Sequence, residues 1–228
     1  MKIFIAGATG AVGRIVCSML GAGNHHVFGM TRRPEMAGFL KTLQVTPVIA
    51  DVYDLPKLRS CFKSIRPELV IHQLTDLPFG LPSEKMEAAR IANARIRDAG
   101  TRNLILAGME CGVERFIAQS IAFVYRDGAL PHTESDPLAS DALRDFENQV
   151  LDGDFEGIVL RYGKFYGPNT GFDAPSGPCH VHVGDAARAA VLSVSRGKQG
   201  VYNIVEDKGV VSSAKAKLEL GWVPEHVQ

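Results

Sequence analysis

The sequence predicts an α/β fold, a doubly wound parallel sheet covered by helices on both faces. Three observations predict it. Short apolar runs alternate with longer segments of helical periodicity, a glycine-rich turn joins the first run to the first helix, and the 228 residues are 46% hydrophobic and 22% charged. Such alternation is typical of parallel strands joined by crossover helices. A chain of this length can bury one substantial core with a small appended lobe.

The composition excludes several classes of protein. The 25 basic residues are balanced by 25 acidic ones, which argues against a nucleic-acid partner. No apolar run is long enough to cross a bilayer, and Met1 and Lys2 lead straight into a strand, unlike a signal peptide. The cysteines, whose spacing fits neither CxxC nor a zinc site, are Cys17, Cys61, Cys111 and Cys179. We therefore expect a soluble, cytoplasmic protein with no nucleic-acid and no membrane partner.

The first strands and helices follow from local patterns. Six short apolar runs predict strands over residues 3–6, 27–30, 47–50, 69–74, 115–119 and 157–160. Between the first two runs, one helix face is apolar at Val12, Ile15, Val16, Met19 and Leu20. Asp54, before Pro56, predicts the cap of a helix after the third run. A long helix is expected over 84–111, and another begins near Pro137.

The regular alternation weakens beyond Tyr162. The segment RYGKFYGPNTGFDAPSGPC, residues 161–179, is rich in glycine and proline and predicts a loop. The later elements are expected, in order, as a strand over 180–183, a helix capped by Asp185, a strand over 200–205, and a helix over 213–220 that Gly221 ends.

The turn FIAGATGAVG, residues 4–13, has the spacing of a dinucleotide-binding turn. Gly7 permits the tight turn, Gly10 lets the backbone approach a pyrophosphate, and Gly13 lets helix and strand pack closely. The N-terminus of the following helix presents free N–H groups to the anion. A strand–turn–helix unit at the start of a βαβ chain is the context that this motif requires. The sequence therefore predicts a Rossmann-like domain, against the alternative of a structural turn without a ligand.

The end of the second predicted strand indicates the cofactor. The segment GMTRRPE, residues 29–35, has Arg32 and Arg33 where an NAD-preferring site has an acidic residue for the ribose hydroxyl. Two guanidinium groups suit a 2′-phosphate. We therefore expect NADP, with NAD less favoured. The alternative is that both arginines are solvated at a helix entrance. Asp51, after the third strand, is expected to accept a hydrogen bond from the adenine amino group.

Seven motifs follow one another along the chain: GATGAVG, DVYD, ERFIAQSIAFVYRDG, LRYGKFYGP, HVHVGDAARAA, GVYNIV and AKAKLELGW. In this order they resemble the extended branch of the short-chain dehydrogenase/reductase family, the NAD(P)-dependent epimerase/dehydratases. The resemblance implies a Rossmann domain over residues 1–163 and a small, reduced C-terminal substrate lobe over 164–228, interleaved with the last Rossmann elements. It implies a small-molecule substrate between them. A homodimer paired through the long helices is a further expectation.

The glycine turn and the resemblance together give the expected site residues. The expected cofactor-binding residues are Gly7, Thr9, Gly10, Val12, Gly13, Arg32, Arg33, Asp51, Val52, Leu74, Thr75 and Tyr162. Leu74 and Thr75 would line the nicotinamide ribose. Phe165 and Tyr166 would face the substrate, against the alternative that they pack under the loop.

The Ser, Tyr and Lys that the family uses for proton transfer are missing from their usual places. The resemblance puts the Ser four residues before the Tyr of a VY dipeptide, here Tyr125, and Ser120 is one residue out of register. The Tyr–Lys pair would fall at Ala139 and Leu143, neither of which can move a proton.

Three interpretations follow. The chain is an NADP-dependent epimerase/dehydratase- or reductase-like enzyme for a small carbonyl or hydroxyl compound, such as a nucleotide sugar. Its catalytic residues are then Tyr125 and Ser120, with Tyr166 as a further candidate proton donor. Alternatively it is a catalytically inactive NADP-binding sensor or partner-binding protein. Or the short segments 169–183 and 203–222 lack loops that family members usually carry.

His180 and His182 alternate on one face of a predicted strand, with Asp185 close behind. A metal site would need a third ligand in place and hydrogen bonds that orient the ligands. We therefore expect no metal.

Overall fold

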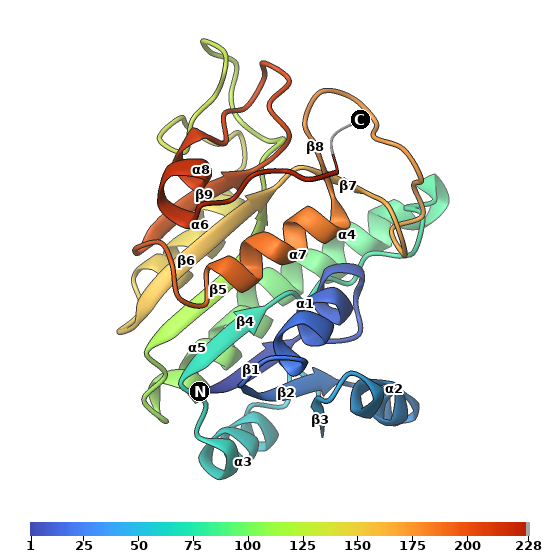
Figure 1. Ribbon diagram of the computed structural model, residues 1–228, viewed down its shortest axis with the longest axis vertical. Coiled ribbons are helices and arrows are strands. Elements are labelled where there is room, and N and C mark those ends of the chain that lie inside the picture. Colours follow the sequence, from blue (N-terminus) through green and yellow to red (C-terminus); the bar gives the residue numbers. More distant parts are fainter. Residues whose placement is uncertain (227–228) are drawn as a thin grey trace.

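The structure, a computed structural model, describes residues 1–226. Its centre is a parallel sheet of seven strands in the order β3-β2-β1-β4-β5-β6-β9, with helices on both faces (Figure 1). These strands are β1 Lys2–Ala6, β2 His26–Thr31, β3 Thr46–Ile49, β4 Leu69–His72, β5 Arg115–Ile121, β6 Glu156–Tyr162 and β9 Gly200–Ile204. The predicted doubly wound α/β fold is confirmed.

The helices divide between the two faces of the sheet. Residues of α1, α2, α7 and α8 pack into one apolar core, and residues of α3, α5 and α6 pack into the other. The helices are α1 Ala11–Gly21, α2 Ala37–Thr42, α3 Leu55–Ile65, α4 Met86–Arg95, α5 Thr101–Met109, α6 Asp141–Leu151, α7 Val183–Leu192 and α8 Ala214–Leu220. Within residues 1–226, no helix has the length and apolar character needed to cross a membrane.

Strand β1 shows why the predicted strands are continuous runs of apolar residues and do not alternate with polar ones. Ile3 and Ile5 belong to the core beneath α1 and α7, whereas Phe4 and Ala6 belong to the opposite core. Successive side chains of a strand point to opposite faces. Because helices cover both faces, consecutive positions in the middle of a central strand are apolar.

Two predicted helix ends are confirmed. The Asp54 side chain accepts a hydrogen bond from the N–H of Lys57 at 2.9 Å and so caps α3. Gly221 has φ +65° and ends α8 in the left-handed conformation. Both ends rest on local chemistry, an acceptor for free N–H groups and a residue without a Cβ.

The long helix expected over 84–111 is one helical stretch with a change of winding inside it. A π-helical segment, Ile96–Gly100, separates α4 from α5. The hydroxyl of Thr101 donates to the carbonyl of Ile96 at 3.3 Å at this point. Such segments insert one residue into the helix, a change that the apolar periodicity does not reveal.

Three local expectations were wrong. Asp185 does not cap α7, because the N-cap is His182, whose side chain accepts from the N–H of Gly184 at 3.2 Å. The loop expected from 161 contains β7 Lys164–Tyr166, which pairs with β8 His180–His182 in a separate two-stranded sheet. The helix expected near Pro137 begins at Asp141. After β8 the chain returns to the main sheet as β9, and the division at residue 163 stays a prediction.

Candidate cofactor-binding site

A cavity of about 280 Å³ lies at the carboxyl ends of the strands, where the order passes from β3 and β2 to β1 and β4. Chain segments that follow each of these four strands line it. The lining residues are Gly7, Thr9, Gly10, Met30, Thr31, Arg32, Arg33, Ala50, Asp51, Val52, Tyr53, Gln73, Leu74, Thr75, Asp76, Leu77 and Ile96. Ligands of open parallel sheets bind at this kind of edge.

In the glycine turn after β1, Gly7 and Gly13 are crowded by backbone atoms, whereas Gly10 has free space beside it. Gly7 has φ +87°, and a Cβ there would lie 2.6 Å from the backbone of Gln73. A Cβ on Gly13 would lie 2.0 Å from the carbonyl oxygen of Gly7, so α1 packs directly on the turn. At Gly10 the nearest atom to such a Cβ is 3.4 Å away, and Gly10 lines the cavity. The first turn of α1 has no side-chain cap and no acidic residue, which leaves it suited to an anion.

Two arginines directly follow β2, at the position where an NAD-preferring chain has an acidic residue. Arg32 forms an ion pair with Asp76, with 2.9 Å between Nη2 and Oδ1. Arg33 donates from Nη2 to the hydroxyl of Thr9 at 3.2 Å. Arg33 therefore lies beside the glycine turn, and Arg32 is held by an acid from the loop after β4.

Gln73 places a polar group without a partner in the wall of the cavity. Its side chain is 5% exposed, and its Nε2 lies 3.5 Å from the hydroxyl of Tyr162. Its Oε1 has no hydrogen-bond partner among residues 1–226. Buried amide oxygens are almost always paired. This unpaired acceptor fits a bound group that carries N–H or O–H donors, as a dinucleotide does.

Nine predicted cofactor residues line the cavity: Gly7, Thr9, Gly10, Arg32, Arg33, Asp51, Val52, Leu74 and Thr75. Val12, Gly13 and Tyr162 do not. Val12 is buried in the core beneath the turn. Tyr162 is also buried, with its hydroxyl 3.5 Å from Nε2 of Gln73, and this burial raises its pKa well above the ordinary value.

Sequence reasoning missed Tyr53, Gln73 and Asp76 as lining residues. The signal was present, because Tyr53 stands in the DVYD motif and the other two in the HQLTD segment after the fourth strand. Asp51 has its own role in that turn, since its Oδ1 accepts from the N–H of Tyr53 at 2.9 Å. The Tyr53 ring packs 4.0 Å from the guanidinium of Arg95.

Comparison with known proteins decides the family. The profile of the family described as NAD(P)H-binding matches residues 7–171. The 3-diazoavenalumate denitrifying reductase of a Streptomyces species is 30% identical over 259 aligned positions, which cover 100% of this chain and 81% of that relative. The chain belongs to the NAD(P)H-binding family. Because the alignment is longer than the 228 residues of this chain, the relative carries residues that this chain lacks.

Solved structures show the same fold. The UDP-glucose 4-epimerase of Thermus thermophilus, in complex with NAD, superposes with a TM-score of 0.82 at 18% identity, covering 100% of this chain and 95% of the other. The UDP-glucose 4-epimerase of Thermotoga maritima, with UDP-glucose, gives 0.81 at 19% identity, covering 99% and 94%. The expected resemblance to the extended short-chain dehydrogenase/reductases is confirmed.

The two hydroxyls predicted to act in this NAD(P)H-binding chain lie away from the cavity lining. Ser120 is fully buried, and its hydroxyl donates to Glu147 at 2.6 Å. Tyr125 donates to Asn203 at 2.6 Å and accepts from Arg161 at 2.8 Å. Burial raises the pKa of Tyr125, and Arg161 only partly offsets this. The catalytic role of both residues stays a prediction, and their partners favour a structural role.

The two residues expected to face the substrate are placed differently from each other. Phe165 packs on Tyr162, with 5.4 Å between ring centroids. Tyr166 is 1% exposed, and its hydroxyl donates to Glu206 at 2.7 Å. Tyr166 is thus a buried side chain of the small sheet, and its substrate and proton-donor roles stay predictions.

His182, Asp185 and His226 offer ligand atoms within 4.8 Å of one another. The imidazole rings of His182 and His226 stack, with centroids 4.0 Å apart and planes 22° from parallel. One ion cannot lie in both ring planes of such a stack, as imidazole ligation requires. Asp185 already accepts the N–H groups of Glu225 and His226. The geometry favours a tie for the C-terminal segment over a metal site.

Proposed function

We propose that this protein is an NADP(H)-dependent reductase of a small, electrophilic molecule. The observation that carries the cofactor is the pair Arg32 and Arg33 directly after β2, where the chain has no acidic residue before Glu35. Support for reduction comes from the Streptomyces relative, a denitrifying reductase whose likeness covers the whole chain.

Different residues of the cavity would bind different parts of the cofactor. The N–H groups of the first turn of α1 would hold the pyrophosphate beside Gly10. The 2′-phosphate would be held by Arg33, which lies next to Thr9, and by Arg32. Arg32 would either keep its ion pair with Asp76 or exchange it for the phosphate. Oε1 of Gln73 would accept a donor of the nicotinamide half. When bound, NADPH supplies a hydride to the substrate, and the proton of the product comes from water.

The missing Tyr–Lys pair favours this reduction over epimerisation. An epimerase or dehydratase must remove a proton from a hydroxyl as the substrate is oxidised, so it needs a positioned base. Ala139 and Leu143 stand where that pair is expected, and Ser120 and Tyr125 are bonded to Glu147, Asn203 and Arg161. A strongly electrophilic substrate needs no such base, which is consistent with the 3-diazoavenalumate named for the relative.

The cofactor proposal is tested by substitution of Arg32. We expect Arg32→Ala to raise the Kd for NADPH about tenfold or more and to change the Kd for NADH less than about twofold, because only the 2′-phosphate loses a partner. Fluorescence titration of both nucleotides measures this. Arg90→Ala, on an exposed part of α4, is the matched control. Equal losses for both nucleotides would contradict an NADP site.

One observation supports a second candidate, a cofactor-binding sensor without turnover. Both candidate hydroxyls are engaged in the interior, so this chain can bind NADP(H) and still lack proton chemistry. NADPH oxidation in the presence of diazo and carbonyl compounds separates the two. Tight NADPH binding with no oxidation of the nucleotide by any compound would favour the sensor.

We also infer a cytoplasmic homodimer. The free cysteines support a reducing compartment. The exposed apolar residues Ile91, Leu106 and Met109 of α4 and α5 support pairing through these helices. Sedimentation velocity measures the mass in solution.

A further inference from the structure

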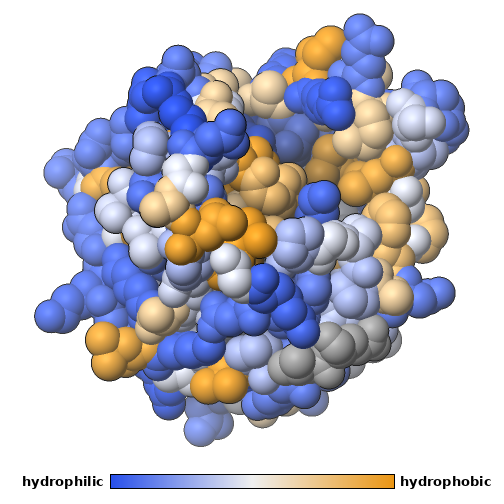
Figure 2. All heavy atoms as spheres, turned by 90° about the horizontal axis from the view of Figure 1, so that it is seen from above, coloured by the Kyte–Doolittle hydropathy of each residue, from blue (hydrophilic) through white to orange (hydrophobic). Residues whose placement is uncertain are grey.

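Exposed apolar side chains follow the carboxyl ends of β4 and β5. Leu77, which lines the cavity, is 41% exposed, and Phe79 on the same loop is 74% exposed. Phe123, two residues after β5, is 42% exposed. Viewed as in Figure 2, the molecule is hollowed near its centre, and apolar side chains gather around the hollow. Exposed apolar groups gathered in this way mark a binding site.

The loops that follow the strands on either side of β5 approach each other closely. The loop after β4 and the loop after β7 touch, because a Cβ on Gly171 would lie 2.4 Å from Cα of Gly80 and 3.6 Å from the ring of Phe79. Strands β4 and β6 flank β5 in the sheet, and β7 begins two residues after β6. Phe123 follows β5, which lies in the sheet between the two strands that precede these loops.

Lys164 brings one positive charge close to the Phe123 ring. It is exposed at the start of β7, and its Nζ lies 5.8 Å from the centroid of the Phe123 ring. Among residues 1–226, no carboxylate lies within ion-pair distance of this ammonium group. Arg14, whose guanidinium also reaches the loop after β7, is engaged by Asn169 at 2.9 Å and by the carbonyl of Thr9 at 3.0 Å.

We propose that the substrate is a flat, unsaturated or aromatic monocarboxylate, with its ring against Phe123 and Phe79 and its carboxylate on Lys164. The proposal rests on the reductase function above and names its substrate class. A single ammonium matches one carboxylate, whereas a diphosphate carries more charge and is bound through several cations or N–H groups. Exposed apolar side chains suit a ring and are a poor match for the hydroxyls of a sugar.

The experiment compares a carboxylic acid with its uncharged methyl ester. Binding of 4-hydroxycinnamate and of its methyl ester is measured by calorimetry on the full chain, with and without NADP⁺, and UDP-glucose is the third ligand. We expect the acid to bind at least about tenfold more tightly than the ester. Lys164→Met should remove this difference and leave the Kd of the ester unchanged. Lys57→Met, on α3, is the matched control and should keep it.

The outcomes are distinct. Acid and ester binding equally, no binding of the acid, tighter binding of UDP-glucose, or a Lys164→Met protein that binds the acid like the wild type would each overturn the proposal. Retained ester binding shows that the variant is folded, and Lys164→Gln replaces it if it is not. Failure of NADPH to bind or to be oxidised would overturn the reductase function alone, because the acid–ester difference is read without turnover.

Discussion

His72 ends β4 with an imidazole that is almost fully buried. Its Nδ1 accepts the N–H of Leu74 at 3.3 Å, so the neutral ring carries its proton on Nε2, 2.9 Å from the hydroxyl of Thr101. Burial, with a smaller contribution from the positive charge of Arg97, lowers the pKa of His72 from 6.5 to about 4. The unfolded chain therefore takes up this proton at a higher pH than the folded chain.

We predict that the protein loses stability through His72 as the pH falls from 6.5 towards 4. The unfolded state binds more protons in this window, so the free energy of unfolding decreases there and levels off below it. At about 1.4 kcal/mol per pKa unit, the loss approaches about 3 kcal/mol. Urea unfolding of the wild type and of His72→Gln, which cannot titrate, measures it. A stability difference that stays constant with pH would contradict the shift.

For single residues, the sequence predicts a role when the contacts that define it are local in the chain. The glycine spacing fixes the turn around Gly7, and Arg32 follows directly after a strand. The partner of Arg32 is Asp76, 44 residues away, and no local pattern joins the two. Only the sheet order brings the loop after β4 to the end of β2. The side chain of Gln73 likewise has a distant partner, since its Nε2 donates to the hydroxyl of Tyr162, 89 residues away.

At the scale of elements, a buried polar network joins β5, α6 and β6. Arg161 of β6 binds both carboxylate oxygens of Glu147 of α6, at 2.9 and 2.6 Å. Burial by itself lowers the pKa of Arg161, but Glu147 outweighs it and raises that pKa, so the guanidinium stays charged. Ser120 of β5 donates a hydrogen bond to Glu147, and Tyr125 accepts one from Arg161. Buried ion pairs need such extra hydrogen bonds.

We predict that Tyr125→Phe weakens the fold more than the chemistry. The change removes a hydroxyl that Arg161 and Asn203 share, so the free energy of unfolding should fall by about 1–2 kcal/mol. The kcat for reduction of the substrate should stay within about threefold of the wild-type value. Denaturation and steady-state kinetics measure both, with Ser120→Ala as the companion variant. A loss of kcat on the order of 100-fold, with stability intact, would instead support the proton-donor role.

Periodicity predicts an element well and its internal hydrogen bonding poorly. The stretch 84–111 is predicted as helix because apolar side chains recur along one face. The π-helical segment Ile96–Gly100 leaves that face apolar, and the hydrogen bonds of Thr101 to Ile96 and His72 that accompany it come partly from another element. Asp185 shows the same limit, since besides Arg188, three residues on, its carboxylate accepts from N–H groups 40 and 41 residues away.

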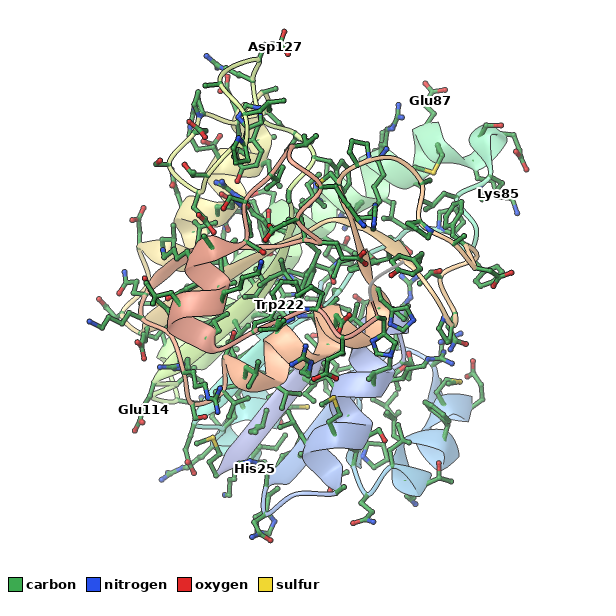
Figure 3. All side chains as sticks on the ribbon, turned by 45° about the horizontal axis from the view of Figure 1, so that its top comes forward. His25, Lys85, Glu87, Glu114, Asp127 and Trp222 are labelled. Carbon is green, nitrogen blue, oxygen red and sulfur yellow. The ribbon has the colours of Figure 1, made fainter. Side chains whose placement is uncertain are left out.

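At the scale of the whole molecule, Asp185 ties the end of the described chain to α7. Trp222 is fully buried near the middle of the molecule (Figure 3), and its Nε1 donates to the carbonyl of Asp185 at 2.9 Å. The Asp185 carboxylate accepts the N–H groups of Glu225 and His226 at 3.0 to 3.1 Å. The chain thereby returns from α8 across the face of the sheet that also carries α1 (Figure 1).

We predict that Asp185→Asn loosens residues 225 and 226, which bond the carboxylate, and lowers the free energy of unfolding by about 2–3 kcal/mol. Burial by itself raises the pKa of Asp185, but the N–H groups of His226 and Glu225 outweigh it and hold that pKa below its ordinary value. The stabilisation is therefore present above the ordinary carboxyl pKa and is lost as the pH falls through the folded value. Hydrogen exchange of the amides of Glu225 and His226 should accelerate in this variant, and Asp173→Asn, at an exposed position, should leave it unchanged. Unchanged exchange in Asp185→Asn would mean that Trp222 alone holds these two residues.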